Sequence, residues 1–350
     1  SGLLAGAVDG GVALWYADRG TRIHTFSGVS GKVVALGFDP AGGTLAAVSS
    51  AAGKETARLW DVATGADKRA FEVGAGTRRV VLGPGGERVF VLALSKLVVH
   101  RADGGAEEYA NVRDFAVSAD GTRFVVGTSE NPGDKTRTMT VRAAADFSEV
   151  DAFEVATEFA AKPAFSPDGA MLFVGTQVRE DGEAKGLVVR RDLAAKADGP
   201  SLTGHGAQIT CFAFSADGAR IATGGRDSQA MLWDAATGTH LQTFTGHANN
   251  INAVAFAPGG TRVVTASQDG TFKLWDTSDG REVLTLQSAA LQGEGQVVAP
   301  AYAGFNRGGG ALVTLTGPEP LSPRVLRAFP ADAGAYPGSA VQGLNARVEA

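Results

Sequence analysis

The sequence lacks the features of disulfide-stabilised and membrane-anchored proteins. Cysteine occurs once in 350 residues, at Cys211, so no internal disulfide can form and a reducing compartment is compatible with stability. The longest apolar stretches, such as residues 89–94, are far short of the roughly 18 residues that mark a membrane-spanning helix. Residues 1–30 have no signal-peptide pattern. These absences predict a cytoplasmic protein without a membrane partner, or a periplasmic one if it is excised from a longer precursor.

Positive charge is also scarce. The chain has 32 Lys and Arg against 37 Asp and Glu, a net charge of −5, and no run of five or more basic residues. A chain of this charge has no overall attraction for a phosphate backbone. The composition therefore predicts no nucleic-acid partner.

Motifs for metal and cofactor chemistry are missing. The sequence has no HExxH, CxxC or EF-hand pattern, no Walker phosphate loop and no G-x-S-x-G elbow. The five histidines lie far apart in sequence: His24, His100, His205, His240 and His247. We therefore predict no metal, no cofactor and no enzymatic activity. The alternative is a propeller hydrolase, because a channel mouth can gather residues from distant parts of a chain.

Glycine and short apolar segments are abundant. Glycine accounts for 48 of 350 residues, well above its usual share of about 7%. Short alternating or apolar runs are separated by turn formers such as Asp217-Gly218, where glycine adopts the positive φ that hairpin turns need. Helical periodicity is essentially absent, so the pattern predicts antiparallel strands throughout.

A repeat organises these strands. The segment from Gly204 recurs 42 residues later from Gly246, and weaker copies extend over the chain. Seven positions mark the last apolar residue before a turn: Phe38, Leu82, Val117, Phe165, Phe214, Phe256 and Phe305. Their mean spacing of about 44.5 residues is typical of four-stranded propeller blades.

The repeat resembles the WD-repeat family. Gly-His pairs occur at Gly204-His205 and Gly246-His247, and Trp-Asp pairs at positions 60–61, 233–234 and 275–276. The resemblance implies an all-β fold, a β-propeller of four-stranded antiparallel blades that forms one domain over residues 1–350. The missing initiator methionine leads us to expect that the domain is part of a longer polypeptide. The abundance of alanine, and of arginine over lysine, favours a bacterial source.

Closure of the ring decides the number of blades. Residues 3–26 have the pattern of the second, third and fourth strands of a unit, and residues 343–350 that of a first strand. Pairing the N- and C-terminal strands would give eight blades and remove the unpaired edges of an open array. The alternative is a seven-bladed ring in which residues 341–348 form an outer strand.

The resemblance also implies a buried tetrad of histidine, hydroxyl residue, aspartate and tryptophan in each well-formed unit. The matching residues are His205, Thr223, Asp227 and Trp233, then His247, Thr265, Asp269 and Trp275. A His, Thr and Asp set can also suggest catalysis, but an unpaired buried polar atom costs about 1 to 3 kcal/mol. We therefore interpret both sets as structural hydrogen-bonded chains.

The family's recognition face is implied to lie around the channel, in the loops before each inner strand and between second and third strands. The candidate partner-binding residues there are Lys32, Asn111, Phe159, Gln208, Arg226, Asn250 and Gln268. Phe159 is the one large apolar candidate, and an exposed aromatic is a common interface anchor. The predicted function is a monomeric, non-catalytic scaffold for a protein or peptide. Besides the hydrolase, a sensor or targeting domain of a larger protein is the alternative.

Overall fold

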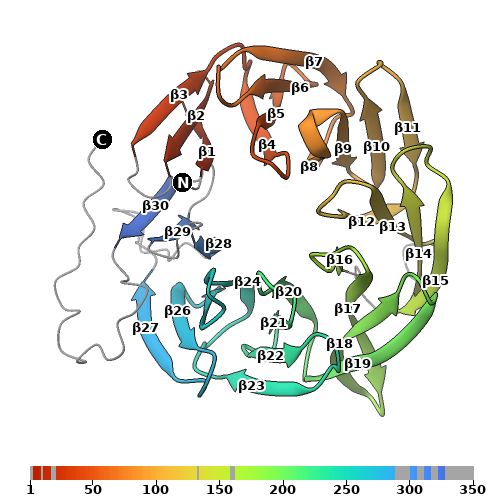
Figure 1. Cartoon of the computed structure of the whole chain (residues 1–350), viewed down its shortest axis with the longest axis vertical. Coiled ribbons are helices and arrows are strands. Elements are labelled where there is room, and N and C mark those ends of the chain that lie inside the picture. The colour runs from red at the N-terminus through yellow and green to blue at the C-terminus, as the bar shows by residue number, and fades with distance from the viewer. Residues whose placement is uncertain are drawn as a thin grey trace.

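A computed structural model describes most of the chain. The described residues are 3–8, 11–16, 21–131, 134–157, 162–287, 300–305, 311–316 and 322–327. Figure 1 shows them as sheets arranged in a ring around a central channel. Apart from the short 3-10 turn η1 (Pro84–Gly86), the described segments contain only strands and their connections. No helix in this part of the chain is long and apolar enough to cross a bilayer.

The described strands form eight antiparallel sheets, six with four strands and two with three. The four-stranded sheets are β4–β7 (Lys32–Phe38, Thr44–Ala51, Lys54–Asp61, Asp67–Val73), β8–β11 (Thr77–Leu82, Arg88–Ala93, Lys96–Arg101, Ala106–Tyr109), β12–β15 (Val112–Val117, Arg123–Thr128, Thr136–Ala143, Glu149–Ala156), β16–β19 (Lys162–Phe165, Met171–Glu180, Glu183–Asp192, Ala197–His205), β20–β23 (Ile209–Phe214, Arg220–Gly225, Ala230–Asp234, His240–Phe244) and β24–β27 (Ile251–Phe256, Arg262–Ser267, Thr271–Asp276, Glu282–Gln287). The three-stranded sheets are β1–β3 (Leu3–Val8, Gly11–Tyr16, Arg22–Phe26) and β28–β30 (Pro300–Phe305, Ala311–Thr316, Ser322–Arg327).

The predicted fold class is confirmed. Strands consecutive in sequence pair antiparallel within each sheet, which is the blade of a β-propeller. The N-terminal segment forms three strands, as its sequence predicts. The strand proposed to complete this sheet, residues 343–350, lies outside the described residues, as does the rival outer strand at 341–348. Closure through the two chain ends, and with it the choice of eight blades over seven, therefore stays a prediction.

Burial changes from the channel to the rim of each sheet. In β9 every residue from Val89 to Ala93 is buried, because this second strand is covered by neighbouring sheets on both faces. The outer strand β7 instead has only half-buried and exposed residues. Neighbouring sheets pack through their apolar faces: the rings of Phe90 in β9 and Phe115 in β12 are 6.1 Å apart. The core is thus divided among the contacts between blades.

Three of the described turns between first and second strands share one construction, with Ser118, Ser166 or Ser215 donating to an aspartate two residues later. Ser215 Oγ donates to Asp217 at 2.5 Å, and Gly218 has φ of 70°. Ser215 N–H also donates to the carbonyl of Arg220. The predicted left-handed glycine is therefore present, but the turn encloses four residues rather than two. The serine side chain closes this longer loop.

The antiparallel topology gives the ring two faces. One carries the turns between first and second strands and between third and fourth strands. The other carries the turns between second and third strands together with the connections from each outer strand to the next inner strand. We call this second face the loop face. The inner strands β4, β8, β12, β16, β20, β24 and β28 begin there and surround the channel in Figure 1.

Candidate binding face

Four predicted residues meet where the sheet β16–β19 contacts the sheet β20–β23. His205, the last residue of β19, has Nδ1 at 2.8 Å from Asp227 and Nε2 at 2.8 Å from Thr223 Oγ1. Trp233 Nε1 donates to the same hydroxyl oxygen at 2.9 Å. An ionised carboxylate only accepts, so Nδ1 of His205 carries a proton and donates it to Asp227. These residues thus form one hydrogen-bonded chain.

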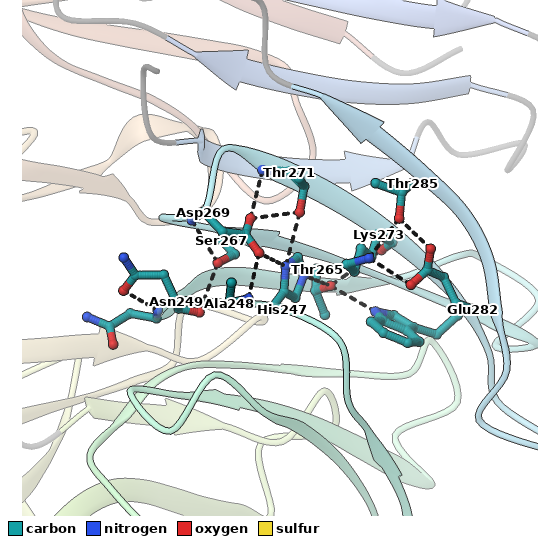
Figure 2. Close-up of polar contacts among 12 residues, drawn as sticks. His247, Ala248, Asn249, Thr265, Ser267, Asp269, Thr271, Lys273, Glu282 and Thr285 are labelled. Carbon is teal, nitrogen blue, oxygen red and sulfur yellow. Dashed lines mark hydrogen bonds and ion pairs between the residues drawn. The ribbon is translucent and has the colours of Figure 1, made fainter. Parts of the chain in front are cut away.

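The second set repeats this geometry in β24–β27. His247 contacts Asp269 at 2.8 Å and Thr265 at 2.7 Å, while Trp275 Nε1 donates to Thr265 Oγ1 at 2.8 Å. Figure 2 shows His247 between Asp269 and Thr265, with Thr271 also directed at the carboxylate. Both sets connect neighbouring blades, because His205 ends the outer strand β19, His247 follows the outer strand β23, and each bonds residues of the next sheet.

The electrostatics of the second set match a structural role. Burial lowers the pKa of His247 below its ordinary value, so the ring is neutral at pH 7. Burial alone would raise the pKa of Asp269, but hydrogen bonds from Thr271, Ala248 and His247 outweigh it and lower the pKa to about 2. The side chains of His205 and His247 have no exposed surface. Neither histidine is therefore an accessible base or nucleophile.

Sheets without a tetrad are joined to their neighbours by other polar contacts, which the sequence analysis did not predict. Arg191 stands where a Trp-Asp pair would place its tryptophan, and its guanidinium binds both oxygens of Asp151 on the neighbouring blade at 2.9 and 3.1 Å. The two side chains are only 12% and 5% exposed. Glu55 instead accepts from the backbone N–H groups of Gly76 and Thr77, which lead into β8. The only sequence signal for this ion pair is that Arg191 occupies the position where the repeat normally has tryptophan.

The structure joins four of the candidate partner-binding residues in pairs on the loop face. The N–H of Arg226 donates to the carbonyl of Gln208 at 2.9 Å. The N–H of Gln268 likewise donates to the carbonyl of Asn250, and Asn250 Nδ2 donates to Gln268 Oε1 at 3.1 Å. Arg226 and Gln268 are exposed and Asn250 is half-buried, whereas Gln208 is 8% exposed. Gln208 thus offers a partner little side-chain surface.

The remaining candidates lie on other blades. Lys32 opens β4 and is exposed. Asn111 precedes β12, is exposed, and has a left-handed backbone with φ of 57°. Phe159 lies outside the described residues, so its predicted role as an apolar anchor stays a prediction.

A different apolar side chain stands on the loop face. Leu94, in the turn between β9 and β10, is 62% exposed, the largest fraction among the exposed large hydrophobic residues. Its N–H donates to the carbonyl of Gly76, which precedes β8. The sequence analysis placed the loops between second and third strands on this face but did not single out Leu94, which precedes no turn aspartate.

Other reactive groups are enclosed or dispersed. Burial raises the pKa of the Cys211 thiol to about 12, so it is protonated at pH 7 and packs as a small apolar group. Within the described ranges, no three His, Cys, Asp or Glu side chains come close enough to hold a metal ion. The chemistry offered by the loop face is hydrogen bonding, charge and apolar contact.

Comparisons with known proteins agree with this geometry. The family model described as "WD domain, G-beta repeat" matches residues 199–234 and 238–276, the two segments that carry the tetrads. The chain is 34% identical over 74 residues to the eukaryotic translation initiation factor 3 subunit I of Botryotinia fuckeliana, and equally to that of Sclerotinia sclerotiorum. Each match covers 21% of this chain and 21% of the relative. The predicted resemblance to WD-repeat proteins is confirmed, whereas these fungal relatives give the predicted bacterial source no support.

Proposed function

Because this chain carries WD repeats within a β-propeller, we propose that it is a non-catalytic scaffold that binds a protein or peptide on its loop face. One observation carries this proposal. The polar groups that could act chemically, in the two tetrads, are enclosed and hydrogen-bonded to one another. The side chains of Lys32 and Arg226 are exposed on the loop face, and Asn250 is half-buried beside them.

The relatives support a role in protein assembly. By name, each is a subunit of a multisubunit translation initiation factor. The chain matches only about a fifth of their length. The similarity therefore supports a role in binding proteins, but it does not support binding to the same proteins as these relatives. We further propose that the protein works as a monomer in the cytoplasm, where its lone, buried thiol is stable in the reduced form.

Affinity capture tests the loop face as the binding surface. The Lys32→Ala, Arg226→Ala, Asn250→Ala variant removes two exposed and one half-buried polar side chain from the loop face. We expect it to lose specific partners that the wild type retains from a source lysate. The matched control is Arg22→Ala, Arg281→Ala, because residues 22 and 281 are exposed on the opposite face. Equal sets of specific partners for the wild type and the loop-face variant would reject the proposal.

A further inference from the structure

A shared irregularity shapes the inner strands. The pairing of β8 with β9 skips one residue between Thr77 and Arg79, and that of β12 with β13 skips one between Val112 and Asp114. Such a bulge leaves its extra residue unpaired and redirects its side chain. The residues at these bulges are Arg78 and Arg113, both exposed at the loop-face end of their strands. Equivalent bulges in β20 and β24 hold the uncharged Thr210 and Asn252.

The next register position carries a row of paired charges. Arg79, Asp114 and Lys162 lie on the successive inner strands β8, β12 and β16. Asp114 binds Arg79 Nη1 at 2.9 Å through one oxygen and lies 3.5 Å from Lys162 Nζ through the other. The only carboxylate in the described inner strands is therefore shared by two cations. Arg78 and Arg113 make no ion pair or hydrogen bond with any described residue.

Positive charge is thus concentrated in one part of an acidic protein. The described inner strands carry five basic side chains, Lys32, Arg78, Arg79, Arg113 and Lys162, against Asp114 alone. We call these five basic residues the basic arc. The strands β20, β24 and β28 carry no charge, so the arc occupies one side of the channel. The chain as a whole has a net charge of −5, whereas the described inner strands carry five positive charges and one negative charge, a net charge of +4.

An apolar side chain accompanies the basic arc. Leu94 has a left-handed backbone with φ of 52°, a conformation that is unfavourable for a branched residue. Its side chain lies over Gly76, where an added Cβ would come within 2.9 Å of it. The neighbouring Ser95 carbonyl accepts from the N–H of Val112 at 2.8 Å. Leu94 is therefore fixed between the strand starts that carry Arg78 and Arg113.

We propose that the basic arc and Leu94 bind an acidic peptide segment that carries an apolar side chain. Arginine pairs with carboxylates through charge-assisted, often bidentate hydrogen bonds. Arg79 is paired with Asp114, so Arg78 and Arg113 are the arginines of the basic arc that can bind carboxylates of a peptide. Leu94 supplies the apolar contact that a purely ionic ligand would not use. This inference rests on the proposed scaffold function and names the chemical class of its partner.

Fluorescence anisotropy tests the proposal with a labelled peptide in which one leucine is flanked on each side by three glutamates. The wild type is expected to bind this probe more tightly than peptides with lysine in place of glutamate or serine in place of leucine. In Arg78→Glu, Arg113→Glu the affinity is expected to fall at least about tenfold. Arg22→Glu, Arg281→Glu makes the same change in net charge on the opposite face and should retain binding. Thermal melting of each variant checks that it is folded.

Leu94→Ser separates a peptide site from a general anion site. We expect it to weaken the leucine peptide and leave the serine peptide unchanged. The proposal is overturned if the leucine peptide does not bind, if both double variants bind it equally, or if inorganic polyphosphate binds as well and Leu94→Ser has no effect. If the peptides fail while lysate capture still depends on the loop face, the scaffold function stands and the acidic class of partner is rejected.

Discussion

At the scale of single residues, one hydroxyl group organises each tetrad. Thr265 Oγ1 accepts from Trp275 Nε1 and is 2.7 Å from His247 Nε2, and Thr265 has no exposed surface. The sequence was sufficient to predict this set, because the WD-type spacing specifies all four members. It did not predict that Gln208 would be buried or that Leu94 would be exposed, since both depend on how a loop folds onto its neighbour.

Thr265→Val removes this hydroxyl with little change in shape. Two buried partners, Trp275 Nε1 and His247 Nε2, then lose their hydrogen bond, at about 1 to 3 kcal/mol for each unsatisfied group. We expect the free energy of unfolding to fall by about 2 to 4 kcal/mol in urea denaturation. Thr138→Val, at an exposed position on β14, should change it by less than about 0.5 kcal/mol. Equal effects of the two variants would contradict the structural role of the tetrad.

The second tetrad also predicts how stability depends on pH. The pKa of Asp269 is lowered from 3.8 to about 2 on folding, so its contribution is present above pH 3.8 and is lost as pH falls towards 2. The pKa of His247 is lowered from 6.5, so stability also begins to fall as pH decreases through 6.5. Urea unfolding across this range should show both losses. Stability that stays constant from neutral pH down to about pH 3 would contradict this account.

At the scale of elements, the regular blades and the degenerate ones differ in how they are tied to their neighbours. The strands β20–β27 carry complete repeats, and the sequence predicted both their pairing and their polar contacts. In β16–β19 the tryptophan is replaced by Arg191, whose partner Asp151 lies on β15. A pair between residues 40 positions apart has no local signature, so the sequence could not reveal it. The bulges that expose Arg78 and Arg113 could not be predicted from the sequence either, because the register of a strand depends on the strand with which it pairs.

Arg191→Met tests the tie between these two blades. It leaves the Asp151 carboxylate 5% exposed and without its arginine, which typically costs about 3 to 5 kcal/mol for a buried pair. Arg191→Met, Asp151→Leu should regain much of that loss, because no buried charge is left unpaired. Lys54→Met breaks a pair with Glu72 in which both side chains are 70% exposed or more, and should cost less than about 1 kcal/mol. Denaturant unfolding of the four proteins measures the differences.

At the scale of the whole molecule, the ring depends on how its two ends meet. Among the described strands, β1 is an edge of its three-stranded sheet, and unpaired strand edges favour association between chains. We predict that residues 343–350 pair with β1. Deleting them should therefore speed hydrogen exchange of the β1 amides and promote concentration-dependent association. Unchanged exchange at β1 after the deletion would instead favour the seven-bladed alternative.

The central claim is that partners bind on the loop face, and site-specific photocrosslinking tests it most directly. A photoreactive amino acid would replace Arg226 or Asn250 on the loop face, or Arg281 on the opposite face, in otherwise unchanged protein. After irradiation in the source cells, we predict discrete crosslinked protein partners from positions 226 and 250 and none from position 281. Crosslinks from position 281 alone would show that the partner binds on the other face and would contradict the account.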